Sequence, residues 1–315
     1  MEKMLSVSAS PHLHSPRTTR GVMLDVILAL LPCIVAGAVI FGPQSLFVVA
    51  FCVVLCVAFE FLSRLIMRRP QTVGDLSAVV TGILLGLCLP VSMAEHLHLC
   101  IVGAFAAIVV TKQMFGGLGN NFVNPALVGR IVMLVSFPAQ MTDWHSYANA
   151  DAITGATPLG KPYEASALLD LFFGTHGGCI GETCVIAVLI GFAYLLIRRV
   201  IKPIIPLCYV GTVVLFSALS CLWSGAGVDF ILFQVLSGGL LFGAVFMATD
   251  YVTSPVTNQG KVIYAVGCGL ITVLIRLFAA LPEGVSYAIV LMNITVPLIE
   301  RIPPIRLAGK KGGAK

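Results

Sequence analysis

The residues of this sequence that could carry chemistry lie in a short polar stretch between long apolar segments. It contains Asp151, Thr154, Gly155, Ala156 and Thr157, in that order. A threonine hydroxyl can be esterified to a phosphoryl group, and the small residues between the two threonines would let a bulky molecule approach the backbone. The stretch therefore indicates a covalent attachment site. The alternative is an ordinary polar turn that the aspartate caps and a proline terminates.

This pattern resembles the Asp-Gly-x-(Ser/Thr)-Gly-Ala-Thr signature at which a flavin transferase links FMN to a threonine by a phosphoester bond. Ala152 departs from it, since a glycine is usual there, but the change removes no reacting group. In so hydrophobic a chain, the signature resembles that of the RnfD family, the D component of the Rnf ion-translocating electron-transport complex. This family is related to the B component of the sodium-pumping NADH:quinone reductase. The resemblance implies that FMN is linked to Thr157. The attachment motif around it would be Asp151, Thr154, Gly155 and Ala156.

The same resemblance extends over nearly the whole chain, from residues 10–17 to residues 300–304, and implies an enzyme subunit. Such a complex passes electrons between ferredoxin and NAD and couples this transfer to Na⁺ or H⁺ movement. The implied partners are the other Rnf subunits, including a second flavoprotein and iron–sulfur subunits. The implied cofactors are covalent FMN and a non-covalent riboflavin. No glycine-rich turn follows a predicted strand, so NAD should bind to a partner subunit.

The composition requires a lipid environment for most of the chain. Hydrophobic residues make up 58% of the 315 residues and charged residues 10%, against about 25% charged in globular proteins. Backbone groups in lipid must be hydrogen-bonded within their own segment, so the sequence predicts an all-α polytopic membrane protein. The net charge of +5 lies mostly at the ends of apolar segments. We therefore expect it to reflect membrane orientation and not nucleic-acid binding.

Ten apolar segments are each near the roughly 20 residues that a spanning helix needs. They cover residues 22–41, 46–67, 76–94, 97–115, 125–140, 183–200, 204–223, 228–248, 261–281 and 285–302. Glycine-punctuated apolar runs that begin with Leu-Ser recur at Leu76 and Leu236. Five helices in each half would invert the second half relative to the first. We therefore predict two five-helix inverted repeats.

This arrangement divides the chain into five parts. They are an N-terminal segment (1–21), a first repeat (22–140), a loop carrying the attachment motif (141–182), a second repeat (183–302) and a basic tail (303–315). With the amino terminus inside, most lysines and arginines fall on the cytoplasmic side and most acidic residues on the other. The sequence therefore predicts a bacterial inner-membrane protein with both termini cytoplasmic and the Thr157 loop external, or periplasmic.

A second candidate site is the glycine- and asparagine-rich stretch 116–127. Asn124 is positioned to cap a helix that begins at Pro125, which would leave a positive, amide-lined helix end facing a ligand. Together with Asn120, it could contact a flavin, a phosphate or the backbone of a partner subunit. The alternative is a tight turn between two helices.

Charged residues inside or near the ends of apolar segments are further candidates, because each costs at least ~2.5 kcal/mol at mid-bilayer. Asp25 and Asp250 could line an ion path, and Asp25 could pair with Arg130. Structural pairing, snorkelling or helix capping is the alternative for each, and capping is favoured for Asp75. Glu182 is predicted to stand at the outward start of the sixth helix, where an acid suits the positive helix end. Glu60 and Arg276 belong to the same group.

Ten cysteines are scattered along the chain, most of them in apolar segments, and no C-x-x-C pair occurs. We therefore expect buried thiols, and neither an iron–sulfur cluster nor a zinc site within this chain. Cys179 and Cys184 are the one pair outside the apolar segments, and they could form a disulfide.

Two other functions fit parts of the pattern. An inverted-repeat ion or solute transporter without a redox group would show flux in the absence of an electron donor. A purely structural anchor for a complex would carry no chromophore, and the loop with Thr157 would be dispensable.

Overall fold

Apolar helices make up nearly all of the regular structure, as expected for a backbone that must satisfy its hydrogen bonds in lipid. The computed structural model describes residues 18–145, 154–155, 168–174, 176–224, 227–279 and 284–302. Residues 1–17, the basic tail 303–315 and the loop residues Asp151, Ala156 and Thr157 lie outside the described part.

The first half of the described chain consists of helices that start at recognisable capping residues. Thr18 caps the first one by accepting a hydrogen bond from the backbone N–H of Gly21 (3.1 Å), and a proline occupies the first position of the second and fifth. The elements are α1 (Thr19–Phe41), α2 (Pro43–Ile66), η1 (Val73–Asp75), α3 (Ser77–Leu87), η2 (Val91–Ala94), α4 (Leu97–Phe105), the π-helix η3 (Ala106–Gln113) and α5 (Pro125–Ser136).

The second half follows a connecting region. The connecting region holds α6 (Pro138–Met141), β1 (Trp144–His145), β2 (Thr154–Gly155) and α7 (Leu168–Phe173). The second half holds α8 (Val185–Ile197), α9 (Ile204–Ser224), α10 (Val228–Leu236), α11 (Leu240–Phe242), the π-helix η6 (Gly243–Met247), α12 (Asn258–Phe278) and α13 (Val285–Ile299).

The lengths of the helices agree with a chain that crosses a membrane several times. The helices α1, α2, α9 and α12 are long and apolar enough to span it, and α10 with Leu240–Met247 forms a fifth candidate bent by 58°. The shorter apolar helices are α3, α4 with η3, α5, α8 and α13. Within the described residues, each predicted apolar segment therefore contains a helix. The protein is a largely α-helical polytopic membrane protein, with β1 and β2 as a two-residue strand pair.

Three predicted helices are interrupted. The fifth was expected to run to residue 140, but α5 ends at Ser136 and Pro138 begins the separate α6. The third was expected to run to residue 94, but α3 ends at Leu87, because Pro90 cannot donate a backbone hydrogen bond and disfavours a helical residue before it. The eighth was expected to be continuous. Instead, Gly238 and Gly239 both adopt φ +65°, a left-handed conformation that separates α10 from α11.

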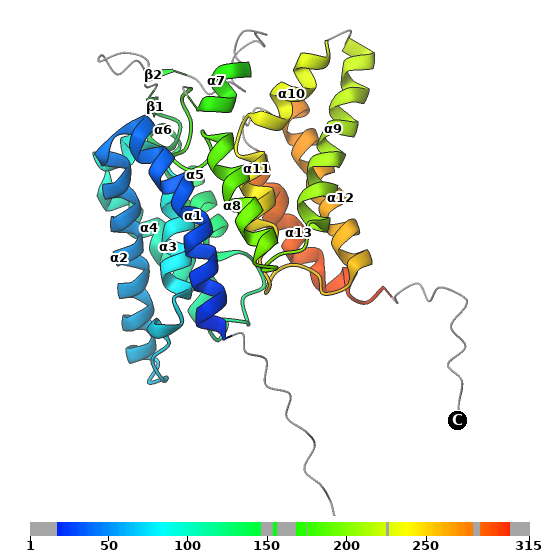
Figure 1. Cartoon of the computed structure of the whole chain (residues 1–315). Helices are drawn as coiled ribbons and strands as arrows, with labels where there is room; N and C mark the ends of the chain where they lie inside the picture. The colour runs from blue at the N-terminus through cyan, green and yellow to red at the C-terminus, as the bar shows by residue number, and fades with distance from the viewer. Residues whose placement is uncertain are drawn as a thin grey trace, which may run out of the picture.

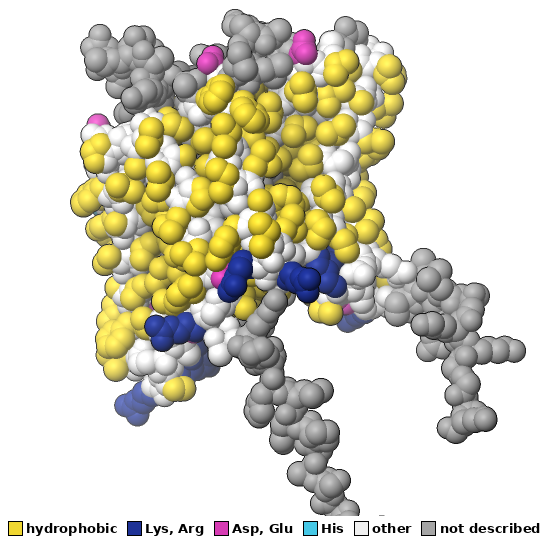
Figure 2. Space-filling model, in the orientation of Figure 1, with side chains coloured by type: hydrophobic (Ala, Val, Ile, Leu, Met, Phe, Trp, Pro, Cys, Tyr) yellow, Lys and Arg dark blue, Asp and Glu magenta, His cyan; other side chains and the backbone are white. Residues whose placement is uncertain are grey.

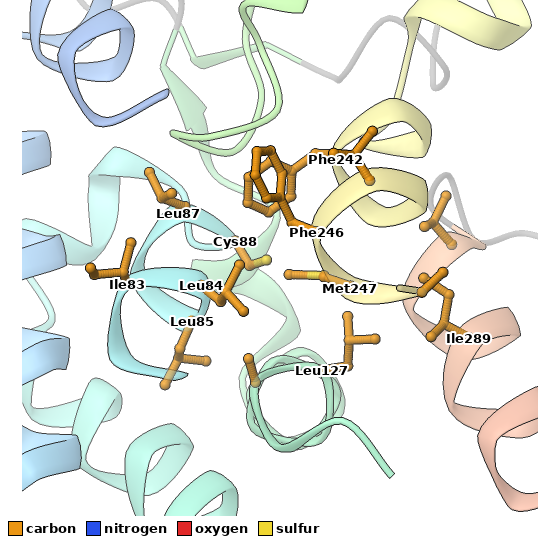
Figure 3. Close-up of a cluster of buried hydrophobic side chains, with 14 of the residues drawn as sticks. Ile83, Leu84, Leu85, Leu87, Cys88, Leu127, Phe242, Phe246, Met247 and Ile289 are labelled. Carbon is orange, nitrogen blue, oxygen red and sulfur yellow. The ribbon is translucent and has the colours of Figure 1, made fainter. Parts of the chain in front are cut away.

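The core lies where these interrupted helices face each other. Figure 1 shows α1 to α5 on one side of the molecule and α8 to α13 on the other. In Figure 3, Leu84 and Cys88 of the α3 region point toward Phe246 and Met247 of η6, and Leu127 of α5 approaches from below. These side chains are all buried. Apolar packing between the two halves therefore surrounds the places where the backbone is irregular.

The outer surface is divided by polarity. On the face that Figure 2 shows, apolar side chains cover the middle, basic side chains gather at the end where α1 begins, and the opposite end shows acidic but no basic described side chains. Figure 1 shows that α13 also ends at the basic end, whereas β1, β2 and α7 lie at the opposite end. The apolar middle is the surface that lipid would cover.

Candidate functional site

The described part of the attachment motif is held at the end opposite the basic one. The strand residues Thr154 and Gly155 pair antiparallel with His145 and Trp144. Trp144 is buried, and the Ser92 hydroxyl of η2 donates a hydrogen bond to the carbonyl oxygen of the preceding residue, Asp143, at 2.9 Å. Thr154 and Gly155 are thus connected through β1 to the helical body. Asp151, Ala156 and Thr157 lie outside the described residues.

A pocket lies between the two halves, near the end where α1 begins. Its walls are mostly apolar and come from α1, α3, α8 and η6. Several polar side chains interrupt them: Ser77, Lys112, Asn121, Asn124, Thr249 and Asp250. A mostly apolar pocket with a few converging polar groups is the usual form of a cofactor site. This pocket is therefore the candidate site within the described helices.

Asn124 joins the two halves at this pocket. Its side-chain oxygen accepts a hydrogen bond from the N–H of Ala126 (3.1 Å), which is the predicted helix cap, and its side-chain nitrogen donates to the carbonyl oxygen of Met247 (3.3 Å). The side chain of Asn293 on α13 lies 2.7 Å from the Tyr264 hydroxyl. With its amide oxygen turned toward α5, Asn293 accepts from the backbone N–H of Asn124 at 3.1 Å.

The two other asparagines of the glycine-rich stretch differ in exposure. Asn120 is exposed and its side chain lies against the backbone of Gly116. Asn121 is buried, donates to the carbonyl oxygen of Val123 (3.1 Å) and lines the pocket. Asn121 is therefore a better-placed ligand contact than Asn120. The clustering of amides in this stretch was the signal, but it could not indicate which of them points inward.

A buried ion pair borders the same pocket. Lys112 Nζ lies 2.7 Å from Glu60 Oε2 and 2.6 Å from Ser77 Oγ, while the Thr72 hydroxyl donates to Glu60 Oε1 (2.8 Å). The Ser77 hydroxyl and N–H both donate to Asp75 Oδ1, so Asp75 caps α3 as favoured. Lys112 was not singled out from the sequence. A lysine inside an apolar segment was the signal that could have identified it.

The predicted pairing of Asp25 with Arg130 is wrong. Asp25 accepts hydrogen bonds from Tyr194 of α8 and from Arg198, the residue that follows α8, at 3.1 Å each. Arg130 is 3.7 Å from Glu182 and 3.2 Å from the Cys179 sulfur. The mistake arose because the sequence does not show that α1 packs against α8, while Arg130 of α5 lies beside Glu182.

Glu182 does not begin a helix, which corrects a second prediction. α8 starts at Val185 with Cys184 as its N-cap residue. The Glu182 carboxylate instead turns inward, accepts from the N–H of Cys179 (3.3 Å) and lies against Gly239 in the break before α11. Cys179 and Cys184 form no disulfide.

The remaining ionisable candidates lie at the two ends of the segment formed by α11 and η6. Asp250 follows η6, lines the pocket and accepts from the Thr253 hydroxyl at 3.1 Å. Arg276 donates to the carbonyl oxygens of Ser237 (2.9 Å) and Gly238 (3.2 Å), which the break leaves without helical partners. Among the described residues, no group of three His, Cys, Asp or Glu side chains could hold a metal ion.

Comparison with known proteins matches this arrangement to one family. Residues 6–308 match the model of the NQR2, RnfD, RnfE family. The chain is 45% identical to the D subunit of the "Na(+)-translocating ferredoxin:NAD(+) oxidoreductase complex" of Acetobacterium woodii, over 98% of this chain and 96% of that one. It is 37% identical to the D subunit of the "Proton-translocating ferredoxin:NAD(+) oxidoreductase complex" of Clostridium ljungdahlii, over 98% of each.

A third relative is the D subunit of the "Ion-translocating oxidoreductase complex" of Mannheimia succiniciproducens, 34% identical over 97% of this chain and 98% of that one. These matches extend across both helical halves and the connecting region. They confirm the resemblance that the threonine motif first indicated. The chain belongs to the NQR2, RnfD, RnfE family.

Proposed function

We propose that this chain is the membrane-embedded D subunit of an ion-translocating complex that passes electrons between ferredoxin and NAD and couples this to Na⁺ or H⁺ movement. The observation that carries the proposal is the near-full-length identity to three relatives that are named as such subunits. One of these relatives is named for Na⁺ and another for protons. The coupling ion is therefore left open between the two. The NAD site is assigned to a partner subunit.

FMN is proposed to be joined to Thr157 by a phosphoester, with Asp151, Thr154, Gly155 and Ala156 as the motif that the flavin transferase recognises. The sequence of the motif supports this, and β2 brings its first described residues to one end of the helical body. FMN can exchange one or two electrons, which suits transfer between iron–sulfur centres and a two-electron carrier. A covalent link would also keep the flavin at high effective concentration.

A second flavin, riboflavin, is proposed to occupy the pocket between the halves. The side-chain amides of Asn121 and Asn124 line this pocket. Each amide can make hydrogen bonds beyond those it makes within the chain, and these would match the carbonyl and imide edge of an isoalloxazine ring. Lys112 would stabilise negative charge at the same edge, and the Glu60 carboxylate holds its ammonium in place. Asp250, which also lines the pocket, and Asp25 are proposed to belong to the ion path.

The proposed topology is ten spans in two inverted five-helix repeats. Support comes from the ten apolar helical segments of the described chain, which divide equally around the connecting region, and from the interruption of the third helix in each half. Both termini are proposed to be cytoplasmic in a bacterial inner membrane, with the Thr157 loop outside, because the basic side chains gather at the end where α1 begins. Moving one elementary charge across that membrane, against the membrane potential, costs about 2.3 kcal/mol per 100 mV of potential.

The attachment is tested on the full chain co-expressed with a flavin transferase. The denatured wild-type polypeptide should fluoresce on a gel under ultraviolet light, and the peptide covering residues 151–161 should gain about 438 Da, the mass of FMN less water. Thr157→Ala should abolish both signals, while Thr142→Ala, which removes a threonine hydroxyl outside the motif, is the control that should retain them. A Thr157→Ala chain that still fluoresces would show that the site is wrong.

The alternative function is an inverted-repeat transporter without a redox group. The break between α10 and α11 favours it, because discontinuous helices form the substrate sites of such transporters. Ion or solute flux through the purified chain in liposomes, without any electron donor, would support this alternative. Flux that requires ferredoxin, NAD and the partner subunits would support the electron-transfer function.

A further inference from the structure

A buried cation lies at the basic end of α2 and has no counter-ion among the residues that the structure describes. Arg64 stands in the last turn of this helix with only 7% of its surface exposed. Its Nε atom has no hydrogen-bond partner, and no ion pair joins its side chain to a carboxylate in the described chain. Glu60, one turn earlier, is already engaged by Lys112 and Thr72. A buried guanidinium without an anion is strongly unfavourable, so a partner is expected here.

A second buried group next to it also lacks a partner. Gln113 ends the π-helix η3 and is fully buried, yet neither its side-chain oxygen nor its nitrogen has a hydrogen-bond partner in the described chain. Buried amides are nearly always hydrogen-bonded, because an unmade bond costs about 1–3 kcal/mol. Two such groups on adjacent elements, α2 and η3, indicate one missing ligand shared between them.

The two side chains converge on a single glycine. Gly117 has φ +97°, and a Cβ atom placed on it would overlap Arg64 Nη2 and lie 3.8 Å from Gln113 Oε1. The Arg64 guanidinium therefore packs directly against the backbone of Gly117, where a residue with a Cβ atom would clash with it. The guanidinium of Arg64 presents N–H donors at this loop, and the Gln113 amide, whose oxygen and nitrogen are both unpaired in the described chain, can turn its N–H₂ group to the same place. Such a set of donors suits an anion with several oxygen atoms, such as a phosphate.

The surroundings of this site match a lipid molecule. Arg68 and Arg69, which follow α2, are exposed, so the site lies where the helix leaves the apolar part of the surface. Large apolar side chains around it are exposed as well: Leu65, Ile66, Met114, Phe115 and Phe122. The rings of Phe115 and Phe122 pack edge to face at 4.8 Å. A cationic pocket between helices with an apolar rim matches a headgroup phosphate followed by acyl chains.

We propose that this site binds an anionic phospholipid. Its phosphate lies against Arg64 and Gln113 beneath Gly117, and its acyl chains lie along Leu65 and Phe115. The inference does not depend on any flavin. It requires only that the chain is embedded in a membrane.

The test uses the complex containing the full chain, purified in mild detergent. Binding of phosphatidylglycerol is titrated against phosphatidylcholine by native mass spectrometry, for wild type, Arg64→Gln and the control Arg69→Gln, which removes an exposed charge from the same end. Arg64→Gln should weaken phosphatidylglycerol binding by about tenfold, and Arg69→Gln by less than about twofold. Equal binding by both variants would overturn the proposal.

A second variant keeps the test decisive if Arg64→Gln fails to fold. Gln113→Glu places a carboxylate beside the Arg64 guanidinium. This carboxylate would take the place of the lipid phosphate. Lipid binding should then be lost while the thermal midpoint of the lipid-free complex stays the same or rises. Inorganic phosphate that protects the wild type as well as phosphatidylglycerol does would identify a free anion and overturn the lipid assignment. Release of a partner subunit by Arg64→Gln, with unchanged lipid binding, would overturn it as well.

Discussion

The ammonium of Lys112 and the carboxylate of Glu60 lie 2.7 Å apart in the interior, although 52 residues separate them in the chain. Their side chains are 2% and 0% exposed. Removing both charges from water is costly, so their attraction and the hydrogen bonds with Thr72 and Ser77 must offset that cost. The pair joins α2 to the π-helix η3. Such widened turns frequently occur at functional sites.

Removing one partner of this pair should destabilise the protein more than removing both. Lys112→Met leaves Glu60 buried and uncompensated, and the expected loss is about 3–5 kcal/mol, whereas Glu60→Leu combined with Lys112→Met should lose much less. Thermal unfolding in detergent measures the difference. If the double variant is less stable than either single variant, the pair is a net source of stability and this account of it is wrong.

The contact between Asn124 and Asn293 should be a coupled link between the two halves. Asn124→Ala removes the cap of α5 and the bond to the Met247 carbonyl, and the expected loss is about 1–3 kcal/mol. Asn293→Ala removes a different bond, the one to the backbone N–H of Asn124, which Asn124→Ala keeps. The losses should still not add, because both sets of bonds position the same residue at the start of α5. A double-mutant cycle on the thermal midpoint measures this, and strictly additive losses would contradict it.

The helices could be predicted from the sequence because the pattern that identifies each one lies within its own segment. Runs of apolar residues near bilayer length identify spans without any knowledge of what packs against them, and Asn124 followed by Pro125 identified the start of α5. The family could be recognised for a similar reason, since the threonine motif is a continuous stretch. These predictions required no information about distance in space.

The contacts could not be predicted in the same way. Whether Arg130 meets Asp25 or Glu182 depends on the order and depth of helices around the core, which composition does not encode. Glu182 turned inward because the backbone at Gly239 leaves room for it, and this break is visible only when the two halves are placed together. Lys112 was missed because a single lysine barely changes the hydropathy of its segment.

Gly239 should tolerate no side chain. A Cβ atom there would overlap Glu182 Oε2, and the residue adopts φ +65°. Gly239→Ala should therefore push Glu182 away from Arg130 and lower the thermal midpoint and the electron-transfer rate together. Gly227→Ala is the matched control, because nothing lies within 4 Å of its Cβ position and its φ is −73°. Equal behaviour of the two variants would argue against the close contact at the break.

His176 should make stability depend on pH in the connecting region. Burial lowers the pKa of its imidazole below the ordinary value of 6.5, and this outweighs the effect of the Asp170 carbonyl, which lies 3.3 Å from Nδ1. As the pH falls, the unfolded chain therefore takes up the proton before the folded chain does. The free energy of unfolding is thus at its full value above pH 6.5 and declines as the pH falls below it. His176→Gln should lose less stability than the wild type between about pH 7 and pH 5. Thermal midpoints across that range measure the effect, with exposed His98→Gln as the control for losing an imidazole. A steeper loss in His176→Gln than in the wild type would mean that the folded protein favours the charged ring.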